Sequence, residues 1–132
     1  MRAIAIGTQG VATLRVGVAH TAAALGSGDV PVFGTPALVA LLEQAAVQAL
    51  QGALAPEETT VGTAMQVNHL AASPVGAEIR AEADLVAIEG RMVTFTVRAF
   101  DPQEKIAEGE HRRVVVLRDR FLKKTEGKRR TA

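Results

Sequence analysis

One long apolar helix, predicted over residues 35–53, most constrains how this chain can fold. Thr35 followed by Pro36 is a strong start signal, because threonine caps free backbone amides and proline at the first helical position gives up no hydrogen bond. Apolar residues then recur at the spacing of a helix with one buried side: Leu38, Leu41, Leu42, Ala45, Ala46, Ala49, Leu50 and Ala53. The rest of the chain must therefore cover this side.

Five candidate strands can provide that cover. One lies at residues 11–19, and four follow the helix at residues 60–70, 77–88, 92–100 and 106–117. The segment Glu89-Gly90-Arg91 predicts a tight hairpin between two of them. The pattern predicts an α+β domain in which long antiparallel strands curl around one helix. A sheet of this kind keeps an exposed edge, for which dimerisation is the expected remedy.

Length and composition narrow the class of protein. With 132 residues, 48% of them hydrophobic, the chain has the material for one domain with its own core, which we place at residues 1–118. Residues 119–132 form a basic C-terminal end, for which disorder is one expectation and covering a ligand is the other.

Several functions are disfavoured by what the sequence lacks. The chain has four Phe but no Trp or Tyr, and its net charge is +1, so it is not expected to bind nucleic acid. Without cysteine it can have neither a disulfide nor a thiol nucleophile. His20 and His111 lack partners at metal-ligand spacing, so we expect no metal and no cofactor. No run approaches the roughly 20 apolar residues of a membrane span, and the start does not resemble a signal peptide, which predicts a cytoplasmic protein.

Three polar side chains stand out against this apolar frame. Glu43 falls between Val47 and Leu50 on the helical wheel, where partial desolvation suits a carboxylate to proton transfer. The alternative for Glu43 is an ion pair, for example with an arginine across a dimer interface. His69 shares strand parity with apolar residues, so it is either a hydrogen-bonded core residue or a base. Thr35 is either a helix cap alone or also a participant at the helix start, where free amides can stabilise an oxyanion.

The run VFGTPALVALLEQAAVQAL, residues 32–50, resembles the central helix of hot-dog-fold thioesterases. Within that fold the chain is most similar to thioesterases related to the fluoroacetyl-CoA-specific enzyme, over about residues 11–117. The resemblance is carried by the spacing of Thr35, Glu43 and His69, by Gly62, and by the stretch GEHRRVVV at residues 109–116. It implies a hot-dog fold, about five strands curled around one central helix, and an acyl-CoA substrate.

The resemblance also implies roles for individual residues. Thr35 is expected to act as nucleophile or to position the attacking water, His69 to act as the base, and Glu43 to orient and stabilise the imidazolium. The alternative makes Glu43 the nucleophile or general base, with His69 secondary. Arg113 matches an arginine that helps to form the acyl pocket, with a surface ion pair as the alternative. Gly62 has the opposite strand parity to His69, so the two share a site only if a bulge intervenes or if Gly62 belongs to another part of the pocket.

Two further residues, Phe33 and Gly34, stand directly before the helix and are expected to bind substrate, Phe33 as the one aromatic wall available there. For the basic end, contact with coenzyme A phosphates is the alternative to a solvated tail. The residues concerned are Lys123, Lys124, Lys128, Arg129 and Arg130.

Helix geometry adds one constraint of its own. Thr35 and Glu43 are eight residues apart, so their backbones are separated by about 12 Å along the helix axis. If both serve one reaction centre, the simplest arrangement takes Thr35 from one subunit and Glu43 from its partner. This geometry predicts a homodimer, or a higher oligomer built from it, and the resemblance implies that it hydrolyses acyl-CoA to a free acid and coenzyme A. Enoyl-CoA hydration or dehydration, and non-catalytic acyl-CoA binding, are the alternative functions.

Overall fold

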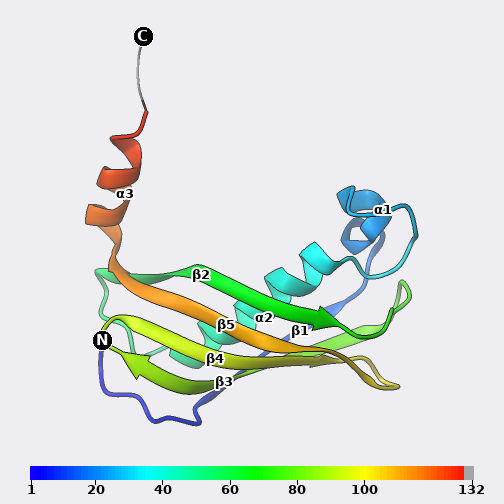
Figure 1. The fold of residues 1–132 in the computed structure, drawn as a ribbon, viewed down its shortest axis with the longest axis horizontal. Coiled ribbons are helices and arrows are strands. Elements are labelled where there is room, and N and C mark those ends of the chain that lie inside the picture. Colours follow the sequence, from blue (N-terminus) through cyan, green and yellow to red (C-terminus); the bar gives the residue numbers. More distant parts are fainter. Residues whose placement is uncertain (130–132) are drawn as a thin grey trace.

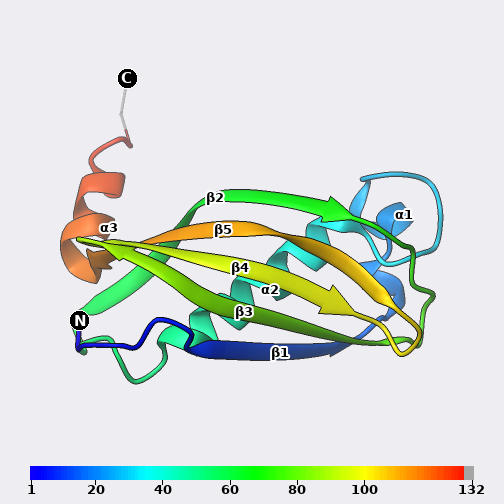
Figure 2. The ribbon, with the colours of Figure 1, turned by 60° about the horizontal axis from the view of Figure 1, so that its bottom comes forward.

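The computed structural model describes residues 1–129 and forms one five-stranded antiparallel sheet that curls around a central helix. The helix, α2, spans Thr35–Leu50, and the strands are β1 (Gln9–Arg15), β2 (Glu58–His69), β3 (Glu78–Glu89), β4 (Met92–Phe100) and β5 (Lys105–Leu117). Their order across the sheet is β1-β3-β4-β5-β2, which leaves β1 and β2 as the edges. Figures 1 and 2 show the strands wrapping one side of α2. The predicted α+β architecture is confirmed.

The core lies between α2 and the inner face of the sheet. The helix buries the apolar side that its spacing predicts, from Leu38 to Leu50. Alternate residues of β3 and β4 complete the core: Ile79, Ala81, Ala83, Leu85, Val93, Phe95, Val97 and Ala99. The hairpin between β3 and β4 turns at Gly90, whose φ of 63° is costly for other residues.

The edge strand β1 crosses α2 at very close range. A Cβ atom added at Gly10 would overlap the Ala45 carbonyl and the Ala49 amide. Only glycine therefore lets this strand lie so near the helix backbone.

The segment between β1 and α2 differs from the prediction. The first strand ends at Arg15, and residues 16–19 are not part of it. A short 3-10 turn, η1 (Val18–His20), follows instead, and His20 Nδ1 accepts a hydrogen bond of 2.9 Å from the Gly17 amide. One helical turn, α1 (Ala22–Leu25), comes next and is capped by Thr21, whose hydroxyl accepts from the Ala24 amide. Local side-chain bonds to the backbone here end the strand.

The start and end of α2 also differ in detail. Gly34, not Thr35, is the N-cap residue, so the predicted capping role of Thr35 is wrong. The helix ends at Leu50 rather than Ala53, because the chain turns at Gly52 with a φ of 87°.

The C-terminal end continues as a helix that the sequence analysis did not predict, α3 (Arg118–Glu126). Of the basic residues singled out there, Lys123 and Lys124 lie exposed on α3, while Arg130 lies outside the described residues. No helix within residues 1–129 has the length and apolar composition needed to cross a membrane.

Candidate functional site

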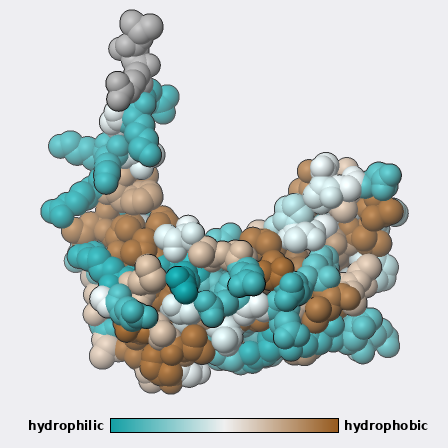
Figure 3. All heavy atoms as spheres, in the orientation of Figure 1, coloured by the Kyte–Doolittle hydropathy of each residue, from teal (hydrophilic) through white to brown (hydrophobic). Residues whose placement is uncertain are grey.

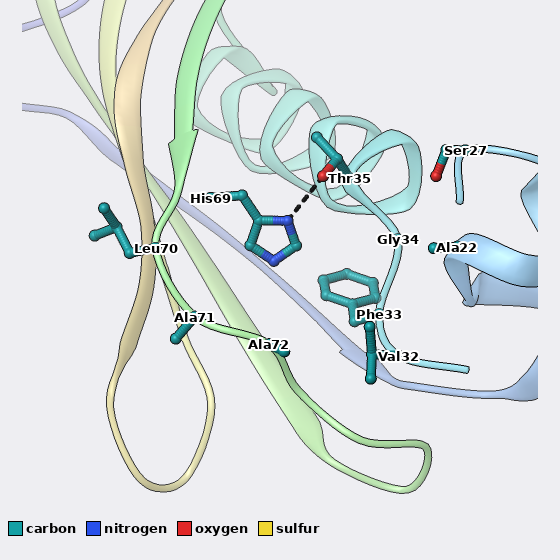
Figure 4. Close-up of a pocket in the computed structure, with 10 residues that line it drawn as sticks. All are labelled: Ala22, Ser27, Val32, Phe33, Gly34, Thr35, His69, Leu70, Ala71 and Ala72. Atoms are coloured by element: carbon teal, nitrogen blue, oxygen red, sulfur yellow. Dashed lines mark hydrogen bonds between the residues drawn. The ribbon is translucent and has the colours of Figure 1, made fainter. Parts of the chain in front are cut away.

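Thr35 and His69 meet at the start of α2 and the end of β2. The Thr35 Oγ1 and His69 Nδ1 atoms are 2.9 Å apart, the distance of a hydrogen bond (Figure 4). The Phe33 ring stands edge-on to the imidazole, with ring centres 6.4 Å apart and planes at 81°. The Thr35 hydroxyl, which does not cap α2, therefore points at His69.

This pair lies in a pocket of about 360 Å³. On the helix side, Phe33 and Gly34 are buried, and a Cβ atom at Gly34 would come within 3.0 Å of the Ala22 amide. Figure 4 shows the other wall, made by the chain that leaves β2. The full lining comprises Ala22, Ser27, Val32, Phe33, Gly34, Thr35, His69, Leu70, Ala71 and Ala72. The pocket is apolar apart from Ser27, Thr35 and His69.

The environment of His69 keeps its ring neutral. Burial lowers the pKa of His69 below its ordinary value of 6.5, and a backbone interaction with Ala71 opposes this shift only in part. The Nε2 atom is buried and has no hydrogen-bond partner in the part of the chain that the structure describes. A neutral imidazole beside a hydroxyl can accept its proton.

The helix start adds hydrogen-bond donors to this pocket. Gly34 uses its own amide to bond the His20 carbonyl at 2.8 Å, and its carbonyl accepts from Leu38 at 3.0 Å. The Thr35 and Ala37 amides, by contrast, donate to no acceptor within residues 1–129. Free amides at the positive end of a helix are suited to hold a negatively charged oxygen.

A second cluster surrounds Glu43, at the middle of α2. The Glu43 carboxylate accepts a hydrogen bond from Arg113 Nη1 at 3.2 Å through its Oε2 atom. The other Arg113 nitrogens bond Thr60, with Nε to the hydroxyl at 3.0 Å and Nη2 to the carbonyl at 3.1 Å. Arg113 is only 6% exposed, so the ion pair is held rigidly. The predicted alternative for Glu43, an ion pair with an arginine, exists here within one chain.

Gly62 belongs to this second cluster rather than to the His69 pocket. A bulge between Gly62 and Ala64 breaks the alternation of side chains along β2. This is the irregularity that Gly62 and His69, with opposite parity in a regular strand, need in order to lie on the same face. A Cβ atom at Gly62 would lie 2.5 Å from Glu43 Oε2 and 3.3 Å from Arg113 Nη1. Glycine is therefore what lets the carboxylate approach the strand. Seven residues of β2 still separate Gly62 from His69, roughly 23 Å.

His111 is a member of the cluster that the sequence analysis considered only as a metal ligand. It is 1% exposed and stacks on Phe95 at 6.3 Å. Its Nδ1 atom is 2.8 Å from the Ala64 carbonyl, so it must donate, and Nε2 then accepts from Arg113 Nη1 at 3.2 Å. Burial lowers the pKa of His111, and the Arg113 charge adds to this effect. His111 and Arg113 are two residues apart on β5, so their side chains lie on the same face of the sheet. This spacing was the signal in the sequence that the two residues belong to one cluster.

The two clusters do not meet within one chain. Glu43 and Arg113 line a separate pocket of about 470 Å³ on the other part of α2, which shares no residue with the Thr35 pocket. Within residues 1–129, no group of three or more His, Cys, Asp or Glu side chains is placed to hold a metal ion. Each chain thus carries two separate polar clusters, one with Thr35 and His69 and one with Glu43 and Arg113.

Comparison with known proteins agrees with this architecture. The family model described as fluoroacetyl-CoA-specific thioesterase matches residues 16–119. The fluoroacetyl-CoA thioesterase of Streptantibioticus cattleyicolor is 38% identical over 97 residues, which cover 74% of this chain and 70% of that protein.

Solved structures show the same likeness in three dimensions. A crystal structure of the fluoroacetyl-CoA thioesterase is 30% identical, with a TM-score of 0.91 over 97% of this chain and 99% of that one. A thioesterase superfamily member from Thermus thermophilus is 25% identical, with a TM-score of 0.89 over 96% and 93% of the two chains. A hot-dog-like protein from Thermanaerovibrio acidaminovorans is also 25% identical, with a TM-score of 0.86 over 96% and 94%. The chain therefore belongs to the fluoroacetyl-CoA-specific thioesterase family, a family of thioester hydrolases with the hot-dog fold.

Proposed function

We propose that this protein hydrolyses an acyl-CoA thioester to a free acid and coenzyme A at two equivalent sites, each shared between two copies of the chain. Thr35 and His69 of one subunit and Glu43 of its partner form each site. A family member has been solved with fluoroacetate and coenzyme A, and another with acetyl-CoA, which supports this class of substrate.

The observation that carries the proposal is the 2.9 Å contact between the Thr35 hydroxyl and the His69 ring inside the pocket at the start of α2. His69 accepts a proton from Thr35, or from a water that Thr35 positions, as that oxygen attacks the thioester carbonyl. The Thr35 amide, at the positive end of α2 and in the lining of the pocket, stabilises the negative charge on the carbonyl oxygen. The protonated imidazole then returns the proton to the departing coenzyme A thiolate, and if Thr35 is the nucleophile a water releases the acid in a second step.

Glu43 is assigned to the partner because its own chain keeps it away from Thr35. About 12 Å of helix axis separates the two residues, and they line different pockets. The free edge of β2 offers a route to join the halves, since two β2 strands paired antiparallel across a two-fold axis bring the Gly62 end of one to the His69 end of the other.

One oxygen of the Glu43 carboxylate remains available for the partner's active site. Its Oε2 atom makes the contact with Arg113, while Oε1 forms no hydrogen bond within residues 1–129. We assign to Oε1 the task of orienting and stabilising the imidazolium that forms on the partner's His69. Arg113 and Gly62 fix the direction in which the carboxylate points.

Subunit mixing tests the shared site. A Thr35→Ala,His69→Ala variant and a Glu43→Gln variant should each be inactive as homodimers. Mixed after subunit exchange, they form heterodimers in which one site is complete and the other lacks all three groups. Statistical mixing then restores about a quarter of wild-type thiol release. Exchange of differently tagged wild-type subunits provides the control. Absence of recovery despite complete exchange would refute the arrangement.

A screen of thiol release over short, branched, aromatic and long-chain acyl-CoAs identifies the acyl group. Release of free coenzyme A from at least one of them is the expected outcome. Binding of every acyl-CoA without any release would contradict the proposed hydrolysis.

A further inference from the structure

The C-terminal helix α3 leaves the body of its own subunit. None of its nine residues is buried, and its main packing partner is the end of β5. A hollow of about 340 Å³ remains between the two elements, lined in part by Val114, Arg120 and Phe121. Figures 1 and 3 show α3 as an arm that stands clear of the sheet. Isolated helices of this length are only marginally stable in water, so α3 needs a further surface to pack against.

The base of this arm lies beside the free edge strand. The Arg118 amide donates to the Glu57 carbonyl at 2.9 Å, and Leu117 is paired with Glu58, the first residue of β2. From there α3 extends past the β2 edge on the side away from β5 (Figure 1). A second copy paired along β2 would therefore meet α3.

The register of the paired β2 strands determines which part of the partner meets α3. This register rests on the proposed function. The shared site requires that Gly62 lie near the partner's His69. In an antiparallel pair, moving back four residues from Gly62 to Glu58 moves the opposite position beyond His69, where the partner's β2 ends and the connection to β3 begins. The segment of the partner that reaches α3 is thus residues 70–77, the connection from β2 to β3.

Each of the two surfaces exposes apolar side chains, although α3 is otherwise mostly charged. On α3, Phe121 is 37% exposed and Leu122 is 54% exposed. On the connection, Leu70 is 53% exposed and Val75 is 45% exposed, and residues 70–77 carry no charged side chain. Exposed apolar groups at both places are what an interface between copies would cover.

We propose that α3 of each subunit docks on residues 70–77 of its partner. Leu70, Ala71 and Ala72 form the outer wall of the pocket that holds Thr35 and His69 (Figure 4). The docked helix supports this wall from outside, so each active site depends on its partner for the rigidity of the pocket as well as for Glu43.

Cysteine cross-linking tests the docking, because the chain has no cysteine of its own. A Val75→Cys,Leu122→Cys variant treated with a short bis-maleimide should give a covalent dimer. The link cannot form within one chain, since Leu122 lies near the Glu58 end of β2 and Val75 lies beyond its His69 end, with roughly 35–40 Å of strand between them.

Three controls separate this inference from the proposed dimer. Each single variant should stay uncoupled, and so should Val86→Cys,Leu122→Cys, because Val86 is exposed on β3 far from the shared edge. Gln66→Cys, near the middle of β2, should link to itself if the β2 strands pair. A Gln66 link without a Val75–Leu122 link overturns the docking and leaves the dimer standing. Absence of both links overturns the dimer and the docking together.

A second measurement uses the strength of association. Leu122→Ser should weaken the dimer about tenfold or more, as expected for loss of a buried leucine contact, whereas Lys123→Ser should leave the dissociation constant near that of wild type. Equal dimer affinity for the two variants would also overturn the docking.

Discussion

At the scale of single residues, the two roles that the sequence presented as alternatives for Glu43, an ion pair and a part in the reaction, do not exclude one another. Its ion pair with Arg113 is structural, because the guanidinium ties Glu43 on α2 to Thr60 on β2. The pair occupies only one carboxylate oxygen, so it is compatible with a role for the other in the proposed reaction. The ion pair within the chain therefore holds the Glu43 carboxylate through Oε2 and leaves Oε1 available for a second hydrogen bond.

His69 is the residue whose removal best separates chemistry from folding. His69→Ala should lower the rate of thioester cleavage by roughly 10²- to 10⁴-fold, as is typical when a positioned proton-transfer group is lost. The melting temperature should change little, because Nε2 has no bonded partner and Nδ1 bonds only an exposed threonine. Turnover and thermal melts measured on one preparation check both expectations.

The pH dependence provides the matching control. In wild type, kcat/KM should fall as the pH drops through the lowered pKa of His69, and the residual activity of His69→Ala should lack this fall. A destabilised but fully active variant would make His69 a structural residue and leave Glu43 as the chief catalytic candidate.

At the scale of elements, regular periodicity predicted most of the fold. The central helix, the β3–β4 hairpin and four long strands appear within a few residues of their expected positions. Features set by contacts distant in sequence were missed. The capping role went to Gly34, because the Thr35 side chain turns instead toward His69 on another element. The short η1 and α1 turns depend on local side-chain caps, which leave no periodic signal.

The residues of the candidate site also fall into those that the sequence predicted and those that depend on contacts distant in sequence. Thr35 and His69 could be singled out by residue type, spacing and family resemblance, and they do share a pocket. The grouping of Gly62 and His111 with Glu43 could not be read from spacing alone, since it depends on the β2 bulge and on the register between β2 and β5. Helix α3 has few apolar residues, and none is buried in its own chain, so the recurring apolar spacing that predicted α2 is absent from it.

The crossing of β1 over α2 should tolerate no side chain at Gly10. Gly10→Ala would force the added methyl into the Ala45 carbonyl and within 2.9 Å of the Ala49 Cβ atom. We expect a loss of about 1–3 kcal/mol or more in the free energy of unfolding, measured as a lower midpoint in urea. Gly28→Ala is the matched control, because its nearest neighbour would be the Ala22 Cβ atom at an ordinary 3.5 Å. Equal midpoints for the two variants would show that the strand can move away from the helix without cost.

At the scale of the whole molecule, two histidines, the buried His111 and the partly buried His69, link stability to pH. Burial lowers the pKa of both His69 and His111 below 6.5, so between 6.5 and those lower values the unfolded chain binds more protons than the folded one. The free energy of unfolding should therefore fall as the pH drops below about 6.5. The carboxylates held in their charged form by neighbouring arginines, Glu82 and Asp84, lose their contribution only at lower pH, through pKa values below 4.5 and 3.8 respectively.

Urea unfolding at about pH 7.5 and about pH 5.5, at one protein concentration, measures this effect. His69→Gln should reduce the difference between the two conditions, because it removes one of the two groups. A free energy of unfolding that is equal at both pH values in wild type would contradict the neutral, buried state of these rings.

The guanidinium of Arg113 also has a thermodynamic consequence. It joins Thr60, on the strand whose edge is proposed to pair with a second copy, to the carboxylate proposed to serve that copy's active site. Subunit pairing and substrate binding then act on one connected group of atoms, and such couplings are reciprocal. A substrate analogue that spans the shared site must tighten the dimer by the same factor by which dimerisation tightens the analogue. Dilution alone would therefore weaken the affinity for the substrate, without any change in the residues of the site.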